Sequence, residues 1–404
     1  MNRKGSSVNA SFLEELEAIP LLDNHCHPFE VRSTPRNLES YLNNFTEAHG
    51  SATQIKASKS IFVIRMMRRM AEVVSSIADD SKLIDGDGRV NHEALVAARE
   101  EIGDLYLAKR LFEMANIRSL VVDTGFPPFD RAVALETMAD ATATTYRTLL
   151  RVETHIESLV TKADSYDELV DLFEADLSDL RAMGHSGLKS IAGYRGGLRI
   201  GQRQSLSDVV AGFEELKAAD RAGERVRLTN RPLLESLVYR AIEHASEQNL
   251  PIQFHVGYGD HDVDLDEANP NNLRNLLEDP KLSGANFVLL HNCWPFFREG
   301  SFLAAIYPNC YIDLSFGIPF LSIDEMEQVA KAIVGTTPSN HIVYSSDGVR
   351  LPEIFFLSAI DGRAIMGDML SRMIDRGEIG EVDGLAIATE IFFENAWKLY
   401  GFDE

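Results

Sequence analysis

The amino-acid sequence predicts an α/β protein built as one (β/α)8 (TIM) barrel. Eight short apolar segments, rich in Val, Ile and Leu, recur along the 404 residues, and the stretches between them have helical periodicity. Eight such units in series favour a closed barrel over an open, doubly wound sheet. No glycine-rich phosphate loop follows the first apolar segment, which further disfavours a dinucleotide-binding fold.

The expected elements follow one another in a regular order. A helix over residues 11–19 comes first, because Ser11-x-x-Glu14 forms a capping box and Pro20 ends the helical pattern. Amphipathic segments that we expect to be barrel helices cover residues 166–183, 231–249 and 324–334. The expected strands cover residues 21–28, 119–126, 149–154, 187–194, 251–259, 286–294, 310–317 and 341–348.

Residues 30 to about 115 contain no convincing strand, and we expect a helical insertion there, within a single domain that spans residues 1–404. Two helical stretches cover residues 55–80 and 91–117. The first stretch has an apolar stripe at helical spacing, formed by Ile61, Ile64, Met67 and Val74. Arginines lie among these residues, a pattern typical of a core-facing stripe with arginines that reach to solvent. A membrane-binding or partner-binding role and a subunit interface are the alternatives for this stripe, and we expect a homo-oligomer.

Composition and charge exclude several classes of partner. The chain is 45% hydrophobic and 25% charged, as is usual for a globular protein, and its formal net charge is -23. A surface this acidic repels phosphate backbones and anionic lipids, so we expect neither nucleic acid nor membrane as a partner. Three cysteines without framework spacing, no apolar signal-peptide core and no apolar run of about 18 residues predict a cytoplasmic protein.

Polar residues at the ends of the expected strands are the candidates for chemistry. In a (β/α)8 barrel the carboxyl ends of all strands point to one mouth, where catalytic residues lie. His25 and His27 end the first strand. Alternate residues of a strand point to the same face, so both imidazoles are expected to enter the barrel while Cys26 points outward. Later strands contribute Lys189, His255, His291 and Asp347.

This ordered set predicts a metal site. The imidazoles of His25, His27 and His255, together with the carboxylate of Asp347, offer three nitrogen donors and one oxygen donor. Such a set suits a divalent cation, zinc first, with manganese or iron as alternatives. A His-x-His pair alone carries little weight, and the prediction depends on the order of these residues along successive strands.

With these motifs the chain resembles the amidohydrolase superfamily and, within it, the amidohydrolase-2 branch. The matching motifs are DNHCHP, GLKSIAGYR, QFHVGYGD, LLHNCWPF and YSSDG. Two stretches, FHVGYGDHDVDLDEANP and YSSDGVRLPEIFF, are similar to the nodulin-type amidohydrolase domain that occurs fused to glutamine synthetase. The resemblance implies that His25, His27, His255 and Asp347 hold the metal. It implies that His291 orients or polarises the substrate.

Lys189 has two open interpretations. An ammonium group cannot bind a cation, so Lys189 joins the metal site only if its amine is carboxylated to a carbamate. In that case the site can hold two ions, with His255 and His291 on the second. Otherwise the charge of Lys189 pairs with a substrate carboxylate or a neighbouring acid. We expect one ion rather than two.

The resemblance implies hydrolysis of an amide-type C–N bond. A bound divalent metal lowers the pKa of water from 15.7 towards about 7. Asp347 is expected to take the proton of the attacking water and pass it to the departing amine. His291 is expected to help to stabilise the oxyanion that forms on the carbonyl oxygen.

Arginines after the fourth strand indicate the substrate class. Arg195, Arg199 and Arg203 stand out in an acidic chain, and a guanidinium matches a carboxylate with two parallel hydrogen bonds. We expect Arg195, together with Arg350, to bind a substrate carboxylate, although a local salt bridge explains any one of these arginines equally well. The glutamine synthetase fusion in relatives points to γ-glutamyl amides.

Other functions stay open on the same scaffold. Metal-dependent decarboxylation of a small aromatic or unsaturated acid needs the same motifs, and sugar or uronate isomerases share the His-x-His start. A non-catalytic metal-binding scaffold is the remaining alternative. The intact set of ligand residues disfavours that last alternative.

Overall fold

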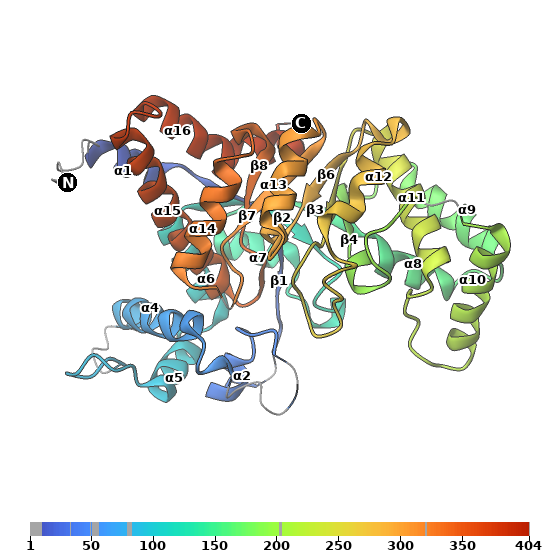
Figure 1. Ribbon diagram of the computed structural model, residues 1–404. Helices are drawn as coiled ribbons and strands as arrows, with labels where there is room; N and C mark the ends of the chain where they lie inside the picture. The colour runs from blue at the N-terminus through green and yellow to red at the C-terminus, as the bar shows by residue number, and fades with distance from the viewer. Residues whose placement is uncertain are drawn as a thin grey trace.

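The computed structural model describes residues 10–32, 34–48, 50, 56–78, 83–201, 204–319 and 321–403 (Figure 1). Parallel strands form its centre, and helices surround them. Most strands are buried almost throughout, as expected for strands covered by helices on the outside and by side chains within. In the strand Thr145–Arg151, only Leu149 and Leu150 are buried.

The strands form one parallel sheet in the order β8-β7-β6-β5-β4-β3-β2-β1-β9. Apart from the pair of first and last strands, neighbours in the sheet are neighbours in the sequence, so each crossover returns beside the strand it left. The strands are β1 (Leu21–Phe29), β2 (Ile117–Asp123), β3 (Thr145–Arg151), β4 (His185–Ser190), β5 (Pro251–Phe254), β6 (Asn286–Leu289), β7 (Cys310–Ser315), β8 (Ile342–Ser345) and β9 (Gly348–Arg350).

The segments β8 and β9 are two parts of one interrupted strand that closes the barrel. β8 pairs with β7, whereas β9, which follows directly, pairs with β1. Asp347 lies in the gap between them, and its backbone N–H donates a hydrogen bond to the carbonyl of His25 at 3.0 Å. The sheet therefore closes on itself, and the predicted (β/α)8 barrel is confirmed.

The third strand lies a few residues earlier than expected. It ends at Arg151, so Glu153 lies in the first turn of the following helix rather than at a strand end. The carboxylate of Glu153 accepts hydrogen bonds from Ser190 Oγ at 2.7 Å and from the backbone N–H of Ile191 at 3.0 Å. Glu153 therefore supports the end of β4 instead of contributing to the mouth.

Helices cover the outside of the barrel (Figure 1). Those outside residues 30–115 are α1 (Ala10–Ala18), α7 (Leu135–Thr142), α8 (Val152–Val160), α9 (Tyr166–Leu177), α10 (Leu206–Arg221), α11 (Arg231–Glu247), α12 (Arg274–Leu277), α13 (Phe297–Ile306), α14 (Ile323–Val334), α15 (Pro352–Asp375), α16 (Glu381–Thr389) and α17 (Asn395–Leu399). The expected helices over 166–183, 231–249 and 324–334 correspond to α9, α11 and α14. None of the helices within the described ranges has the length and apolar character needed to cross a bilayer.

The segment between β1 and β2 is helical. Its helices are α2 (Leu38–Leu42), α4 (Ile61–Ala78), α5 (His92–Ile102) and α6 (Asp104–Ala115). The stretch over 91–117 is two helices rather than one, because Gly103 takes a φ of 81° and ends α5. α6 packs against α15 and α7 on the barrel. In Figure 1, α2, α4 and α5 lie together on one side of the barrel, below the ends of the strands.

The buried face of α4 differs from the expected stripe. Met67 and Val74 are buried as predicted, but Ile61 and Ile64 are 67% and 54% exposed. The buried face also contains Phe62, Val63, Met66 and Met70. Apolar residues occur around more than half of this helix, so spacing alone could not decide which stripe faces the core.

A buried ion pair joins the helices of this segment to the barrel. Nε of Arg99, on α5, lies 2.7 Å from Oε1 of Glu353, on α15, and both side chains are at most 1% exposed. The hydroxyl of Tyr41, on α2, donates to the same carboxylate oxygen at 3.2 Å. These bonds hold α2 and α5 in place relative to α15.

The interior of the barrel is closed at the amino ends of its strands. Tyr400, just after α17, is buried against apolar side chains of several strands. Its hydroxyl accepts a hydrogen bond from Gln253 Nε2 and donates one to Asn24 Oδ1, both at 2.7 Å. The open end of the barrel is therefore the carboxyl end, where function is expected.

Candidate metal centre

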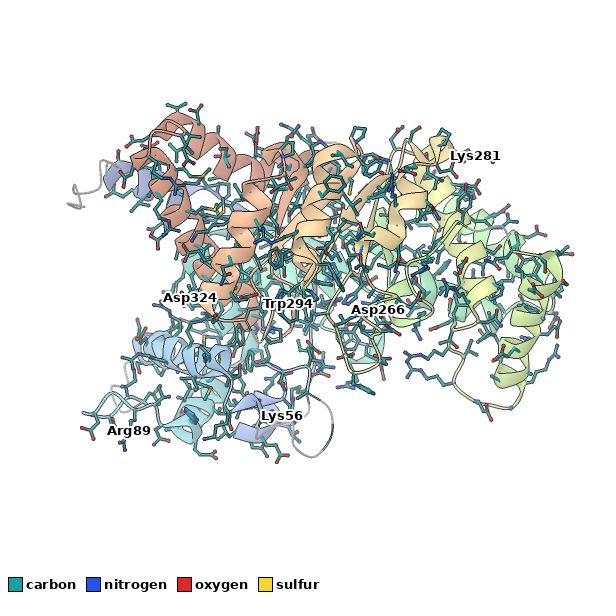
Figure 2. The ribbon with its side chains drawn as sticks, in the orientation of Figure 1. Lys56, Arg89, Asp266, Lys281, Trp294 and Asp324 are labelled. Atoms are coloured by element: carbon teal, nitrogen blue, oxygen red, sulfur yellow. The ribbon has the colours of Figure 1, made fainter. Side chains whose placement is uncertain are left out.

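All the strand-end residues predicted from the sequence meet at one cavity of about 340 Å³. They are His25, His27, Lys189, His255, His291 and Asp347. Figure 2 shows at which end of the barrel the cavity lies. Asp266 and Trp294, in the loops after β5 and β6, lie on the side that faces α2. Lys281, which precedes β6, lies at the opposite edge of the barrel. The cavity is thus at the carboxyl ends of the strands, as expected for this fold.

Asp347 is the centre of the cluster. Its Oδ1 lies 3.5 Å from Nε2 of His25 and 3.6 Å from Nε2 of His27. Its Oδ2 lies 3.6 Å from Nδ1 of His291. One carboxylate therefore faces three imidazoles. The distances between its oxygens and the ring nitrogens are too long for strong hydrogen bonds, but they keep these potential metal-binding atoms close together.

The orientation of these rings fits a metal ion. Nδ1 of His27 lies 3.1 Å from the carbonyl oxygen of Asp123, so it carries the proton and leaves Nε2 free as a donor atom. Two groups of three in the described part of the chain keep their donor atoms within 4.8 Å of one another: His25, His27 and Asp123, and His25, His291 and Asp347. Neutral imidazole nitrogens and carboxylate oxygens are donors that suit a divalent transition metal.

His255 lines the cavity but is oriented differently. Its Nε2 lies 2.6 Å from the carbonyl oxygen of Tyr258, which leaves Nδ1 as its available nitrogen. Its ring centre is 4.4 Å from that of His291, and within the described residues His291, not His255, belongs to the close group around Asp347. The role of His255 as a ligand stays a prediction.

Strained backbone places Asp347 and His291 at the site. Asp347 and His291 have φ values of 52° and 62°, in the left-handed region that side chains rarely adopt. The carboxylate of Asp23 accepts hydrogen bonds from the backbone N–H and the hydroxyl of Ser346, beside Asp347. Asp313 accepts from the N–H of Asn292 at 2.7 Å, beside His291. Buried carboxylates below the site therefore hold both turns.

Burial sets the charge states of the site. It lowers the pKa of His25 to about 4 and holds the pKa values of His255 and His291 well below their usual range. These rings are neutral near pH 7, the form in which imidazole binds metals. Burial alone would raise the pKa of Asp347, but the neighbouring imidazoles of His291 and His25 hold it well below its usual range. Asp347 is therefore ionised.

Lys189 lies against the same cluster. Its side chain is 2% exposed, and its Nζ is 3.4 Å from Nε2 of His25. Burial lowers the pKa of Lys189 to about 8. Asp123, the carboxylate that most opposes this lowering, is engaged by Arg151, whose Nη2 lies 2.6 Å from Oδ2. The placement is compatible with a carbamate and with an amine, so both interpretations of Lys189 stay open.

The arginines expected to bind substrate fall into two groups. Arg195 and Arg350 line the cavity, whereas Arg199 is exposed, does not line it and lies 3.9 Å from Glu267. Arg203 lies outside the described residues. Arg350 packs over the ring of Phe126 at 4.9 Å, and its buried Nε has no hydrogen-bond partner in the described part of the chain.

Several residues of the cavity wall were not identified from the sequence. They are Glu47, Arg151, Tyr194, Arg227 and Asp260, among others. Tyr194 is the last residue of the expected strand over 187–194, and Asp260 directly follows the expected strand over 251–259, so their position at strand ends was the available signal. Glu47 had no such signal, because it comes from the segment between β1 and β2 and reaches the mouth only through the tertiary fold.

Comparison with known proteins supports the resemblance to amidohydrolases. A family model described as amidohydrolase matches residues 208–402, which include His255, His291 and Asp347. Protein fluG of Emericella nidulans is 29% identical over 225 residues, which are 54% of this chain and 26% of that protein. The chain thus spans about a quarter of the length of this curated relative.

Solved structures share the fold over nearly the whole chain. A protein from Lactobacillus casei ATCC 334, provisionally described as a metal-dependent hydrolase, superposes with a TM-score of 0.82 at 27% identity and covers 97% of this chain and 98% of its own. The uronate isomerase of Thermotoga maritima gives a TM-score of 0.66 at 12% identity, covers 96% of each chain and shows the shared fold alone.

The resemblance to the amidohydrolase-2 branch is therefore confirmed: the C-terminal half of the chain matches the amidohydrolase family model, and the barrel mouth holds His and Asp side chains positioned to bind a metal. The match to this family model indicates an enzyme. Proteins of the same fold are described as a hydrolase and as isomerases, so the fold does not choose the reaction.

Proposed function

We propose that this protein is a metal-dependent hydrolase that cleaves an amide-type C–N bond of a small carboxylated substrate, such as a γ-glutamyl amide. The single observation that carries the proposal is the position of Asp347. Its carboxylate lies within 3.6 Å of nitrogen atoms of His25, His27 and His291, at the mouth of a polar cavity. The proposed general base, the proposed partner of the oxyanion and the proposed metal ligands therefore lie close together.

The proposed ligands are His25, His27, His255 and Asp347, with Lys189 only if it is carboxylated. Zinc is the first metal to test. When bound, a divalent cation supplies Lewis acidity and makes water acidic enough to act as a nucleophile near pH 7. The neutral imidazoles and the ionised carboxylate of this site are the protonation states that such a cation requires.

The protein's own groups supply the proton transfers. Asp347 is the proposed general base, because its carboxylate is ionised and accepts a hydrogen bond from the hydroxyl of Tyr258 at 3.3 Å. The same carboxyl group then protonates the departing amine. His291, on the other side of Asp347, is proposed to stabilise the charge that develops on the carbonyl oxygen.

The carboxylate of the substrate is proposed to bind Arg195 and Arg350. Both side chains line the cavity, and each has a buried guanidinium nitrogen without a hydrogen-bond partner in the described part of the chain. An unsatisfied buried donor of this kind is the group that a bound carboxylate satisfies.

The test is elemental analysis of the purified protein followed by paired assays. We expect a bound divalent metal and the release of amine from γ-glutamyl amides by the zinc-loaded protein. Release of carbon dioxide from small aromatic acids, without amine release from any amide, would assign the decarboxylase alternative. Protein purified without chelator that holds no metal and gains no activity on metal addition would support a non-catalytic scaffold.

A further inference from the structure

Two carboxyl groups from distant parts of the chain form one wall of the cavity. Glu47 lies in the segment between β1 and β2, and Asp260 lies in the loop after β5. Glu47 is half-buried, Asp260 is exposed at the mouth, and their side chains are hydrogen-bonded to each other. Two carboxyl groups can share a hydrogen bond only if one of them carries a proton.

This pair is connected to the metal centre through Tyr194. The backbone N–H of Asp260 donates a hydrogen bond to the hydroxyl of Tyr194 at 3.3 Å. The ring of Tyr194 lies 4.3 Å, centre to centre, from the ring of His255. A small molecule with its reacting carbonyl among the histidines could therefore reach Glu47 and Asp260 across one tyrosine side chain.

The cost of placing these carboxyl groups together indicates a missing positive partner. Burial, the bond to Asp260 and the charges of Asp260 and Asp347 raise the pKa of Glu47 to about 8, and Arg350 opposes this only in part. Once the shared proton is lost, the two carboxylates repel each other, and a cationic group beside them would take the place of that proton. The pair is also not part of any group of three close metal donors in the described residues, which argues against a second metal there.

Arg195 provides an independent sign of a ligand in the same cavity. Its side chain is 5% exposed, and its Nη2 lies 3.2 Å from Oε1 of Glu157. Its Nε and Nη1 are buried and have no hydrogen-bond partner within the described ranges. A buried guanidinium that lines a cavity with two unused nitrogens is suited to an anionic ligand group.

We propose that the cavity recognises a zwitterionic amino-acid group, with its ammonium at Glu47 and Asp260 and its carboxylate at Arg195. This inference rests on the proposed function and narrows its substrate class to amides that carry a free α-amino acid group. A carboxylated amide without the ammonium leaves the acidic pair unmatched and is expected to be a poor substrate.

The test compares two compounds that differ only in the ammonium group, L-glutamate and glutarate. Isothermal titration calorimetry with the purified full chain is expected to show about tenfold or tighter binding of L-glutamate, the range of one hydrogen bond between charged groups. Glu47→Gln and Asp260→Asn should each reduce this ratio towards one. Asp266→Asn removes an exposed carboxylate of the same loop that does not line the cavity, and it should leave the ratio unchanged (Figure 2).

Failure of this inference and failure of the proposed function are separable. Equal affinity for the two compounds, or no measurable binding of either, overturns the inference even if amides are hydrolysed. A clear preference for L-glutamate that depends on Glu47 supports the inference even if no amide is cleaved. In that case only the proposed hydrolytic function fails. Glu47→Asp, which keeps the charge, should retain more of the preference than Glu47→Gln, so that a folding defect is not mistaken for loss of recognition.

Discussion

Asp347 and His25 are joined twice across the closure of the barrel. The N–H of Asp347 donates to the carbonyl of His25 at 3.0 Å, and Oδ1 of Asp347 lies 3.5 Å from Nε2 of His25. The first bond belongs to the pairing that closes the sheet, and the second contact belongs to the candidate metal centre. The strand pairing that closes the barrel therefore also brings Asp347 next to His25 in the candidate metal centre.

Replacement of Asp347 tests its role as general base. Asp347→Asn retains an oxygen donor but removes the ionisable group, so we expect partial metal binding and a loss of about 10²–10⁴ in kcat. Metal content and the rate of amine release are measured on the same preparation. The control is Asp324→Asn, which changes an exposed carboxylate on α14 (Figure 2). Activity of Asp347→Asn close to that of the wild type would refute the assignment.

Removal of the metal should lower the melting temperature. A ligand that binds the folded chain alone stabilises it by about 2.7 kcal/mol at 100 times its dissociation constant. We expect chelator to lower Tm and zinc to restore it, and we expect His25→Ala to abolish both responses. His244→Ala, on α11 and outside the cavity, is the matched control. A zinc-dependent rise in Tm that survives in His25→Ala would show that the metal binds elsewhere.

The Arg151–Asp123 pair should be a large determinant of stability. Asp123 is fully buried, and Arg151 is the cation that holds its pKa well below the usual range despite burial. Arg151→Met leaves that carboxylate without its partner, which typically costs about 3–5 kcal/mol. Denaturant unfolding measures the loss. The double variant Arg151→Met/Asp123→Asn should recover part of it, and no recovery would mean that the charge of Asp123 is not the cause.

Glu47 predicts an unusual pH dependence of stability. Its folded pKa is raised from 4.5 to about 8, so its contribution to stability is complete below pH 4.5 and is lost as the pH rises through 8. Glutamine keeps the neutral hydrogen-bonding form at every pH. We therefore expect Glu47→Gln to raise Tm relative to the wild type more at pH 9 than at pH 5. The opposite trend would mean that Arg350, rather than Asp260 and Asp347, dominates the surroundings of Glu47.

The buried Arg99–Glu353 pair should govern the attachment of α2 and α5. Arg99→Leu removes the cation that links α5 to α15, leaving Glu353 buried without its partner. We expect faster limited proteolysis between residues 56 and 103 and weaker substrate binding, because Glu47 follows α2. Arg89→Leu changes an exposed arginine of the same segment and is the control (Figure 2). Equal cleavage rates in the two variants would exclude this role for Arg99.

Local sequence patterns were sufficient for the barrel and for the strand-end residues. His25 and His27 could be assigned to one face because alternate residues of a strand share a face, and Asp347 could be assigned to the mouth because it follows a buried apolar segment. The same reasoning failed for α4, where Ile61 and Ile64 are exposed. Helical spacing predicts an apolar stripe but does not show which neighbour covers it.

The sequence by itself therefore determined the parallel strands, their order and, except for the third strand, the polar residues at their ends, since each depends on short periodic patterns. Only the tertiary structure decided that Glu47 faces Asp260, that Arg151 engages Asp123, and that His291 rather than His255 lies next to Asp347. These relationships join residues far apart in the chain through turns with positive φ and through packing of helices. Their geometry depends on long-range contacts, which no local pattern of residues encodes.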